Sequence, residues 1–288
     1  MQTLVEQFLN ALQMGVLLFL ISSGLSLIFG LMHVVNLAHG ALYMLGAYFA
    51  LTVVRASGSF MLALIVAPLI TAVVGALLER LLLRRTYGRG MHPQVLLTFG
   101  LVFCFDEIVR MVWSPQIQTI ELPAVLAGTF TIAEVIVPSY RAFVVVVGIV
   151  VTAALVLLFN RSRLGAQVRA SVDDPDMAAS LGIDVKRLFT VLFALGAGLA
   201  GLGGTLAVPI FTAYPGMGSE ILISALVVVV VGGMGSLFGA LLASLLVAFA
   251  IVFGQVLLAE FATAMIYVVL IAVLLFRPQG LMGIARPA

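Results

Sequence analysis

Residues 222–253 read LISALVVVVVGGMGSLFGALLASLLVAFAIVF and decide the class of fold. Two apolar runs, Leu222–Val231 and Leu237–Phe253, flank a glycine-rich break and hold no charged residue, as is typical of segments that lie in lipid. The whole chain agrees, with 63% hydrophobic and 9% charged residues and a mean hydropathy of +1.27, against about 25% charged in soluble domains. We predict a polytopic membrane protein and exclude disordered, collagenous and disulfide-rich secreted classes.

Nine segments are candidate membrane spans. Helices are favoured over a barrel because the segments are apolar on all faces instead of alternating. Since a full crossing needs roughly 20 helical residues, Leu222–Val231 is too short for one. We therefore expect residues 1–288 to form a single all-α polytopic membrane domain with about eight or nine transmembrane helices, one of them short or re-entrant. The segments are Leu9–Met32, Ala38–Val54, Phe60–Leu83, Val95–Val112, Ala142–Phe159, Phe189–Val208, Leu222–Val231, Leu237–Phe253 and Phe261–Phe276.

Basic residues gather in three short loops, which hold 11 of the 14 Lys and Arg residues. Lys and Arg are enriched in cytoplasmic loops, so the sequence predicts that all three loops are cytoplasmic and that the N-terminus lies outside. The C-terminus is then inside only if the chain crosses twice, or enters and returns, between residues 222 and 253. The three groups are Arg80, Arg84, Arg85 and Arg89; Arg161, Arg163, Arg169, Lys186 and Arg187; and Arg277 and Arg286.

The loop at residues 160–187 reads NRSRLGAQVRASVDDPDMAASLGIDVKR and contains the pattern of a short helix. Asp174 can cap the free N–H groups, Pro175 fits the first helical position, and Gly182 can close the end in the left-handed conformation. Ala178, Ala179 and Leu181 give this helix a small apolar face, with Met177 beside them. Such a helix can enter a groove on another protein; the alternative is a connector that only joins two spans.

Polar residues at the junction of the first two spans point to a second region of interest. Asn36, His33 and His39 at membrane depth must face the bundle interior or an aqueous path, and Gly40 indicates a helix break there. Both a role in the translocation path and a simple polar turn remain open. The two histidines are six residues apart and so do not share one helical face, which argues against a zinc site.

Glycines in the last third of the chain allow two interpretations. Gly196, Ala200 and Gly204 recur every four residues, so that helices can approach closely there. The break at Gly232 and Gly233 could line a substrate route, as broken helices do in transporters. Tight helix packing is the alternative for both sets.

Several functional classes are excluded by missing motifs. The one lysine, Lys186, follows Val185, so the chain has no phosphate-binding P-loop. No acidic residue falls clearly in the middle of a predicted span, which argues against an ion-coupled transporter. The net charge of +2 does not indicate nucleic-acid binding, and the single Cys104 cannot form an internal disulfide. We predict no catalytic residue and no metal or cofactor bound by this chain.

Four stretches resemble one family of proteins. They are GLSLIFGLMHVVNLAHGALYMLGAYFA (24–50), RLGAQVRASVDDPDMAASLGIDVKRLFTVLFALGAGLAGLGGTL (163–206), ALVVVVVGGMGSLFGALLAS (225–244) and LLFRPQGLMG (274–283). In this order they resemble the bacterial branched-chain amino-acid ABC transporter permeases of the LivH type. The resemblance covers nearly the whole chain and implies the ABC importer permease fold.

The resemblance also implies partners and a site. Such a permease would pair with a second related permease, two cytoplasmic ATPases that bind ATP and Mg²⁺, and a periplasmic substrate-binding protein in the bacterial inner membrane. The cargo would be leucine, isoleucine or valine, with urea, short amides, other amino acids or a stand-alone small-solute channel as alternatives. Residues 160–187 would form the ATPase-coupling loop, with Arg169, Ala170, Asp174, Pro175, Ala178, Ala179 and Gly182 at its matching positions, and Asn36, His39, Gly40, Gly232 and Gly233 remain the candidates for the translocation path.

Overall fold

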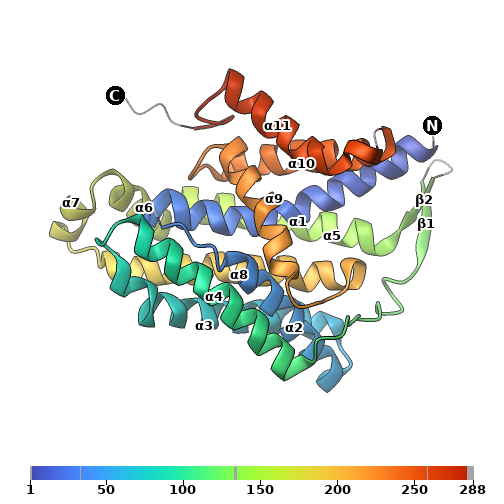
Figure 1. Ribbon diagram of the computed structural model, residues 1–288, viewed down its shortest axis with the longest axis horizontal. Helices are drawn as coiled ribbons and strands as arrows, with labels where there is room; N and C mark the ends of the chain where they lie inside the picture. The colour runs from blue at the N-terminus through green and yellow to red at the C-terminus, as the bar shows by residue number, and fades with distance from the viewer. Residues whose placement is uncertain (1, 33, 133–134, 258, 284–288) are drawn as a thin grey trace.

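The computed structural model describes residues 2–32, 34–132, 135–257 and 259–283 (Figure 1). His33 and Arg286 lie outside these residues. The helices are α1 (Gln2–Met32), α2 (His39–Ser57), α3 (Phe60–Leu81), α4 (Met91–Trp113), α5 (Ser139–Arg161), α6 (Arg163–Asp173), α7 (Pro175–Ser180), α8 (Val185–Phe211), α9 (Met217–Gly232), α10 (Leu237–Leu257) and α11 (Ala262–Phe276). Two 3-10 helices, η1 (Leu83–Thr86) and η2 (Ala259–Phe261), and two strands, β1 (Thr129–Ile132) and β2 (Val135–Pro138), complete the described elements.

Each of the nine predicted spans is helical in the structure. Within the described residues, six helices are long and apolar enough to cross a membrane, namely α1, α2, α3, α5, α8 and α10, and α9 and α11 contain shorter apolar helices. The prediction of an all-helical polytopic membrane protein is therefore confirmed. Helix α4 is not among the six, and it carries three charged side chains, Asp106, Glu107 and Arg110.

The break between the last apolar helices lies where the glycines predicted it. Helix α9 ends at Gly232 and α10 begins at Leu237. Gly233 and Gly235 adopt φ values of 94° and 85°, a conformation that favours glycine because it has no Cβ. Helix α9 begins at Met217 and has 16 residues, so the short piece is longer than the predicted Leu222–Val231.

A two-stranded hairpin is the one feature of the architecture that the all-α prediction missed. Strands β1 and β2 pair antiparallel, with Thr129 opposite Pro138, inside the long connection between α4 and α5. Their sequences, TFTI and VIVP, are rich in the β-branched residues that favour strands. The segment is short and lies outside the apolar runs, so the hydropathy pattern gave no sign of it.

Helix α8 packs against α1, α2 and α3 in the centre of the bundle. In Figure 1, α1, α3, α5 and α8 run along the length of the molecule, and α9 runs across that direction. Glycine backbones meet where α8 crosses α1 and α2: a Cβ on Gly24 would lie 2.5 Å from the carbonyl oxygen of Gly196, and one on Gly46 would lie 2.3 Å from the Cα of Gly201. A Cβ on Gly204 would lie 2.0 Å from the carbonyl oxygen of Tyr43. The predicted close approach at the four-residue repeat is confirmed.

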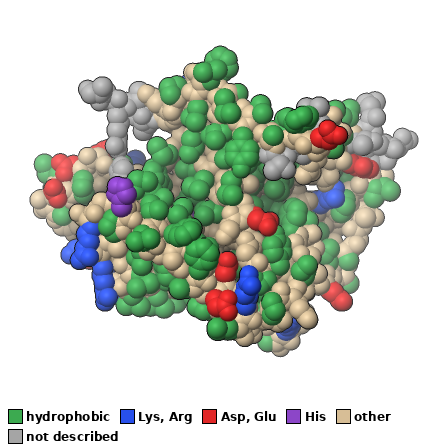
Figure 2. Space-filling view, in the orientation of Figure 1, with side chains coloured by type: hydrophobic (Ala, Val, Ile, Leu, Met, Phe, Trp, Pro, Cys, Tyr) green, Lys and Arg blue, Asp and Glu red, His purple; other side chains and the backbone are tan. Residues whose placement is uncertain are grey.

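Much of the outer surface of the bundle is apolar, and Figure 2 shows broad hydrophobic areas with some charged side chains among them on one face. On α3, exposed large hydrophobic residues recur every fourth position and so lie on one side of the helix. Exposed apolar side chains also cover α4, α5 and α11. This surface is suited to lipid contact. The α3 residues are Ile65, Leu69, Val73, Leu77 and Leu81.

The α1–α8 crossing can be tested with one alanine. We expect Gly24→Ala to lower the thermal-unfolding midpoint of the purified protein in detergent, because its Cβ meets backbone atoms of Gly196 and overpacking costs about 1–3 kcal/mol. The matched control is Gly100→Ala on α4, where no atom of the described residues beyond the neighbouring helix backbone lies within 4 Å of the added Cβ. There the better helix propensity of alanine should hold or raise the midpoint. Equal midpoints for the two variants would contradict the close crossing.

Candidate coupling loop and substrate cavity

The coupling loop at residues 160–187 folds into two short helices with side-chain caps. Asp174 Oδ1 accepts hydrogen bonds from the N–H groups of Asp176 at 3.0 Å and Met177 at 2.9 Å. Pro175 begins α7, and Gly182 follows it with φ 87°. The predicted cap, first position and left-handed glycine are all confirmed. The Asp174 bonds fix the start of α7, and the N–H groups of Gly182 and Ile183, which donate to the carbonyl oxygens of Ala179 and Ala178, fix its end.

The side chains of α7 face two environments. Ala178 is 1% exposed and so faces the protein itself, whereas Ala179 is exposed. Met177 and Leu181 are 59% and 75% exposed and, being four residues apart, lie on the same side. The prediction that Ala178 shares an exposed face with Ala179 and Leu181 is wrong, because successive helix positions are turned by about 100° and Ala178 is on the inner side.

Arg169 and Ala170 of α6 make hydrogen bonds to the end of α5 and to the residue that precedes α7. The Nη1 group of Arg169 donates to the carbonyl oxygen of Phe159, and the N–H of Asp174 donates to the carbonyl oxygen of Ala170 at 3.1 Å. A displacement of α7 therefore acts on α6 and, through α6, on α5.

A buried polar network, the Glu79 clamp (Glu79, Arg84, Tyr87 and Thr190), joins the end of α3 to the start of α8. The Glu79 side chain is fully buried and accepts hydrogen bonds from Arg84 at 3.1 and 3.2 Å, from Tyr87 at 3.1 Å and from Thr190 at 2.7 Å. Arg84 also donates to the carbonyl oxygen of Lys186 at 3.0 Å. Burial, and then the adjacent Glu79 carboxylate, raise the pKa of Tyr87, so its hydroxyl stays protonated and continues to donate.

The sequence prediction missed this clamp. Its one local signal is Glu79 at the end of a long apolar run, five residues before Arg84. Thr190 comes from more than a hundred residues further along the chain, so no local pattern connects it to Glu79.

The five predicted path residues are buried in the structure. Asn36 is 1% exposed and both of its amide atoms lack a partner among the described residues. His39 Nε2 lies 3.0 Å from the carbonyl oxygen of Ile21, and its Nδ1 lacks a described partner. A Cβ on Gly40, Gly232 or Gly233 would meet backbone atoms of Gly218, Gly239 or Gly283, at 2.0, 2.6 and 2.5 Å respectively. These three glycines are positions of close packing.

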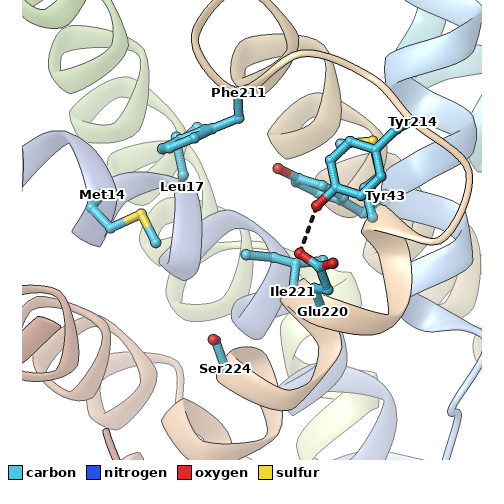
Figure 3. A pocket seen from close by; sticks show the side chains of 9 residues that line it. Met14, Leu17, Tyr43, Phe211, Tyr214, Glu220, Ile221 and Ser224 are labelled. Carbon is cyan, nitrogen blue, oxygen red and sulfur yellow. Dashed lines mark hydrogen bonds between the residues drawn. The ribbon is translucent and has the colours of Figure 1, made fainter. Parts of the chain in front are cut away.

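A cavity of about 230 Å³ lies at the connection between α8 and α9 (Figure 3). Its apolar wall comes largely from α1 and α9, and its polar groups are two tyrosines, a glutamate and a serine. None of the five predicted path residues lines it. The lining residues are Met14, Leu17, Tyr43, Phe211, Tyr214, Met217, Glu220, Ile221 and Ser224.

Tyr214 and Glu220 form the polar centre of this cavity. The Tyr214 hydroxyl donates to Glu220 Oε2 at 2.6 Å, as the dashed line in Figure 3 marks. Burial and the Glu220 carboxylate raise the pKa of Tyr214 to about 12. The phenol is therefore a donor throughout the neutral range and holds the carboxylate in place.

Charged side chains gather on the face that carries α4 and α9 (Figure 2). Helix α4 carries Asp106, Glu107 and Arg110, and α9 carries Glu220. Ionised groups in contact with lipid tails are costly. These charged positions are therefore better suited to an aqueous path or a partner subunit than to lipid, in contrast to the apolar stripe of α3.

An apolar helical bundle with an amphipathic cavity and a capped loop outside its spans is the architecture of a polytopic membrane permease. The chain belongs to the family described as "Branched-chain amino acid transport system / permease component", whose model matches residues 7–276. It is 31% identical to the high-affinity branched-chain amino acid transport system permease protein BraD of Pseudomonas aeruginosa and 25% identical to LivH of Escherichia coli K12. Both alignments cover 97% of this chain and 95% of the relative.

A second type of relative also matches. The chain is 29% identical to LivM of Escherichia coli K12, a permease protein of the high-affinity branched-chain amino acid transport system, over 92% of this chain and 67% of LivM. No solved structure gives a significant match.

Removal of the Glu79 carboxylate tests the clamp. We expect Glu79→Ala to lower the free energy of unfolding by about 3 kcal/mol, because Arg84 and Thr190 lose their buried acceptor. The control is the exposed Arg85→Ala, which should change it by less than about 0.5 kcal/mol. Unfolding of both variants would be followed by SDS titration in mixed micelles, and a similar small effect in both would show that the clamp adds no stability.

Proposed function

We propose that this chain is one of two permease subunits of an ATP-driven ABC importer for leucine, isoleucine and valine. The observation that carries the proposal is the family match over residues 7–276, together with relatives that align over nearly their whole length and are named branched-chain amino acid permeases. The similarity to LivM, which covers 67% of LivM, supports a related second permease as the partner in a heterodimer.

The proposed orientation places the N-terminus and the hairpin in the periplasm of the bacterial cell and the coupling loop and the C-terminus in the cytoplasm. The clustering of Arg84, Arg85, Arg161 and Lys186 near the coupling loop supports this orientation. A periplasmic binding protein would then deliver the substrate at the hairpin end of the bundle.

Helix α7 is proposed to seat on a cytoplasmic ATPase. Exposed Met177 and Leu181 offer an apolar contact outside the membrane spans, and the Asp174 cap keeps the helix rigid. ATP and Mg²⁺ would bind to two such partner ATPases, and this chain would bind no cofactor and catalyse no reaction. Their closure would move α7, and the bonds of Arg169 and Ala170 would pass the motion to α5.

The proposed contact between α7 and an ATPase is tested by a charged substitution on the exposed side of α7. We expect Ala179→Glu to abolish co-purification of P-loop ATPases with the chain while membrane insertion is unchanged, because a buried charge without a partner opposes docking. The matched control is Ala166→Glu, the same substitution at an exposed position of α6, which should retain the ATPases.

Mass spectrometry of the complexes purified from native membranes would give the readout. Recovery of the wild-type chain without P-loop ATPases and without a second permease, even after crosslinking, would contradict the importer proposal and favour a self-assembled channel. Retention of the ATPases by Ala179→Glu would contradict the role of α7 alone.

Asn36 and His39 remain proposed path residues because their buried polar atoms lack described partners. In a Cys104→Ser background, Asn36→Cys and His39→Cys should be protected from a polar thiol reagent in the described state, where both positions are buried. Their labelling should increase by about tenfold or more when ATP is trapped in the complex. The exposed Ser57→Cys should label equally in both states. Uniform protection would show that positions 36 and 39 only pack the junction.

A further inference from the structure

We propose that the cavity beside Tyr214 and Glu220 binds the primary ammonium group and the branched aliphatic chain of the transported solute. The inference rests on the function proposed above and adds the binding site to it. It concerns residues from α1, α2 and the α8–α9 junction that the sequence analysis did not single out.

The Glu220 carboxylate is free to accept a cation. Among the described residues, no Lys or Arg nitrogen lies within 4.0 Å of it, and its one hydrogen bond there is the 2.6 Å bond from Tyr214 to Oε2. Oε1 is thus open to a donor from a ligand. The neutral hydroxyl of Tyr214 brings no positive charge that would compete with an ammonium group for this carboxylate, and hydrogen bonds between charged groups are the strong ones.

The apolar wall lies close to this carboxylate. Met14 and Leu17 come from α1, Phe211 from the end of α8 and Ile221 from α9 (Figure 3). Apolar walls with a few fixed polar groups are typical of small-molecule sites. A small solute with an aliphatic chain next to its ammonium group matches this arrangement, whereas urea has no apolar part and a carboxylic acid without an amine would be repelled by Glu220.

The size and the remaining polar groups agree with a single small amino acid. The volume of about 230 Å³ equals that of about eight water molecules in the liquid. Ser224 lies one turn after Glu220 on the same side of α9, and Tyr43 reaches the cavity from α2 (Figure 3). Their hydroxyl groups can donate hydrogen bonds to a ligand carboxylate.

The experiment uses a cysteine as a reporter inside the cavity of the full chain in its purified complex. Ser224→Cys in a Cys104→Ser background would be labelled with a polar thiol reagent in the presence of L-leucine, isoamylamine, isocaproate or urea. Isoamylamine is leucine without its carboxylate, and isocaproate is leucine without its amine. We expect leucine and isoamylamine to slow the labelling and isocaproate and urea to leave it unchanged. If Ser224→Cys does not accumulate, Leu17→Cys on the α1 wall serves as the reporter.

Substitutions at the polar centre supply the second readout. Glu220→Gln should raise the leucine concentration that gives half protection by about tenfold to hundredfold, and Tyr214→Phe by about threefold to tenfold. The control is Glu121→Gln, at an exposed position that does not line the cavity, which should leave this concentration unchanged.

Uptake of radiolabelled leucine by the assembled importer separates the two proposals. If uptake occurs while isoamylamine gives no protection, or while Glu220→Gln behaves as the wild type, the site is wrong and the function stands. If leucine is not taken up while isoamylamine protects the cysteine and Glu220→Gln removes the protection, the site stands and the proposed cargo is wrong. Protection by isocaproate equal to that by isoamylamine would also overturn the ammonium site.

Discussion

The contact of bare helix backbones around α8 is the constraint on which the rest of the structure depends. In lipid, apolar side chains gain little from leaving the solvent, so helices associate through close van der Waals packing. Gly24 against Gly196 and Gly46 against Gly201 provide that packing, since neither crossing has room for a Cβ. Helix α8 is therefore held by α1 and α2 over its central turns. Its first residue follows the coupling loop and its last residue lines the cavity, the two features for which functions are proposed.

Helix α8 connects these two features because it runs as one continuous helix from the coupling loop to the cavity. Its first turns are capped by Asp184 and bound to α3 through the Glu79 clamp, next to the coupling loop. Its last residue, Phe211, lines the cavity, and Tyr214 follows three residues later. Because packed helices move as units, a displacement that begins at α7 and reaches α8 also changes the wall of the cavity.

Sequence patterns predicted the parts of the structure that depend on neighbouring residues. Apolar runs predicted a helix at each of the nine segments, and Asp174, Pro175 and Gly182 predicted both ends of α7, because these patterns depend on neighbouring residues. The inward side of Ala178 depends on α6 and α8, which pack on α7, and so was assigned wrongly. The Glu79 clamp and the cavity unite residues as distant as Met14 and Ser224, for which a single sequence carries no signal.

The predicted path residues and the unpredicted cavity lie next to each other along two helices. On α1, Ile21 follows the cavity residue Leu17 by one turn, and on α2 the cavity residue Tyr43 follows His39 by one turn. The bond of His39 to Ile21 thus lies directly beyond the cavity, away from the hairpin end. The Gly40–Gly218 contact joins α2 to α9 at the same level. On the proposed path, a solute held at Glu220 would reach His39 and Asn36 after α9 moved away from α2 at this contact.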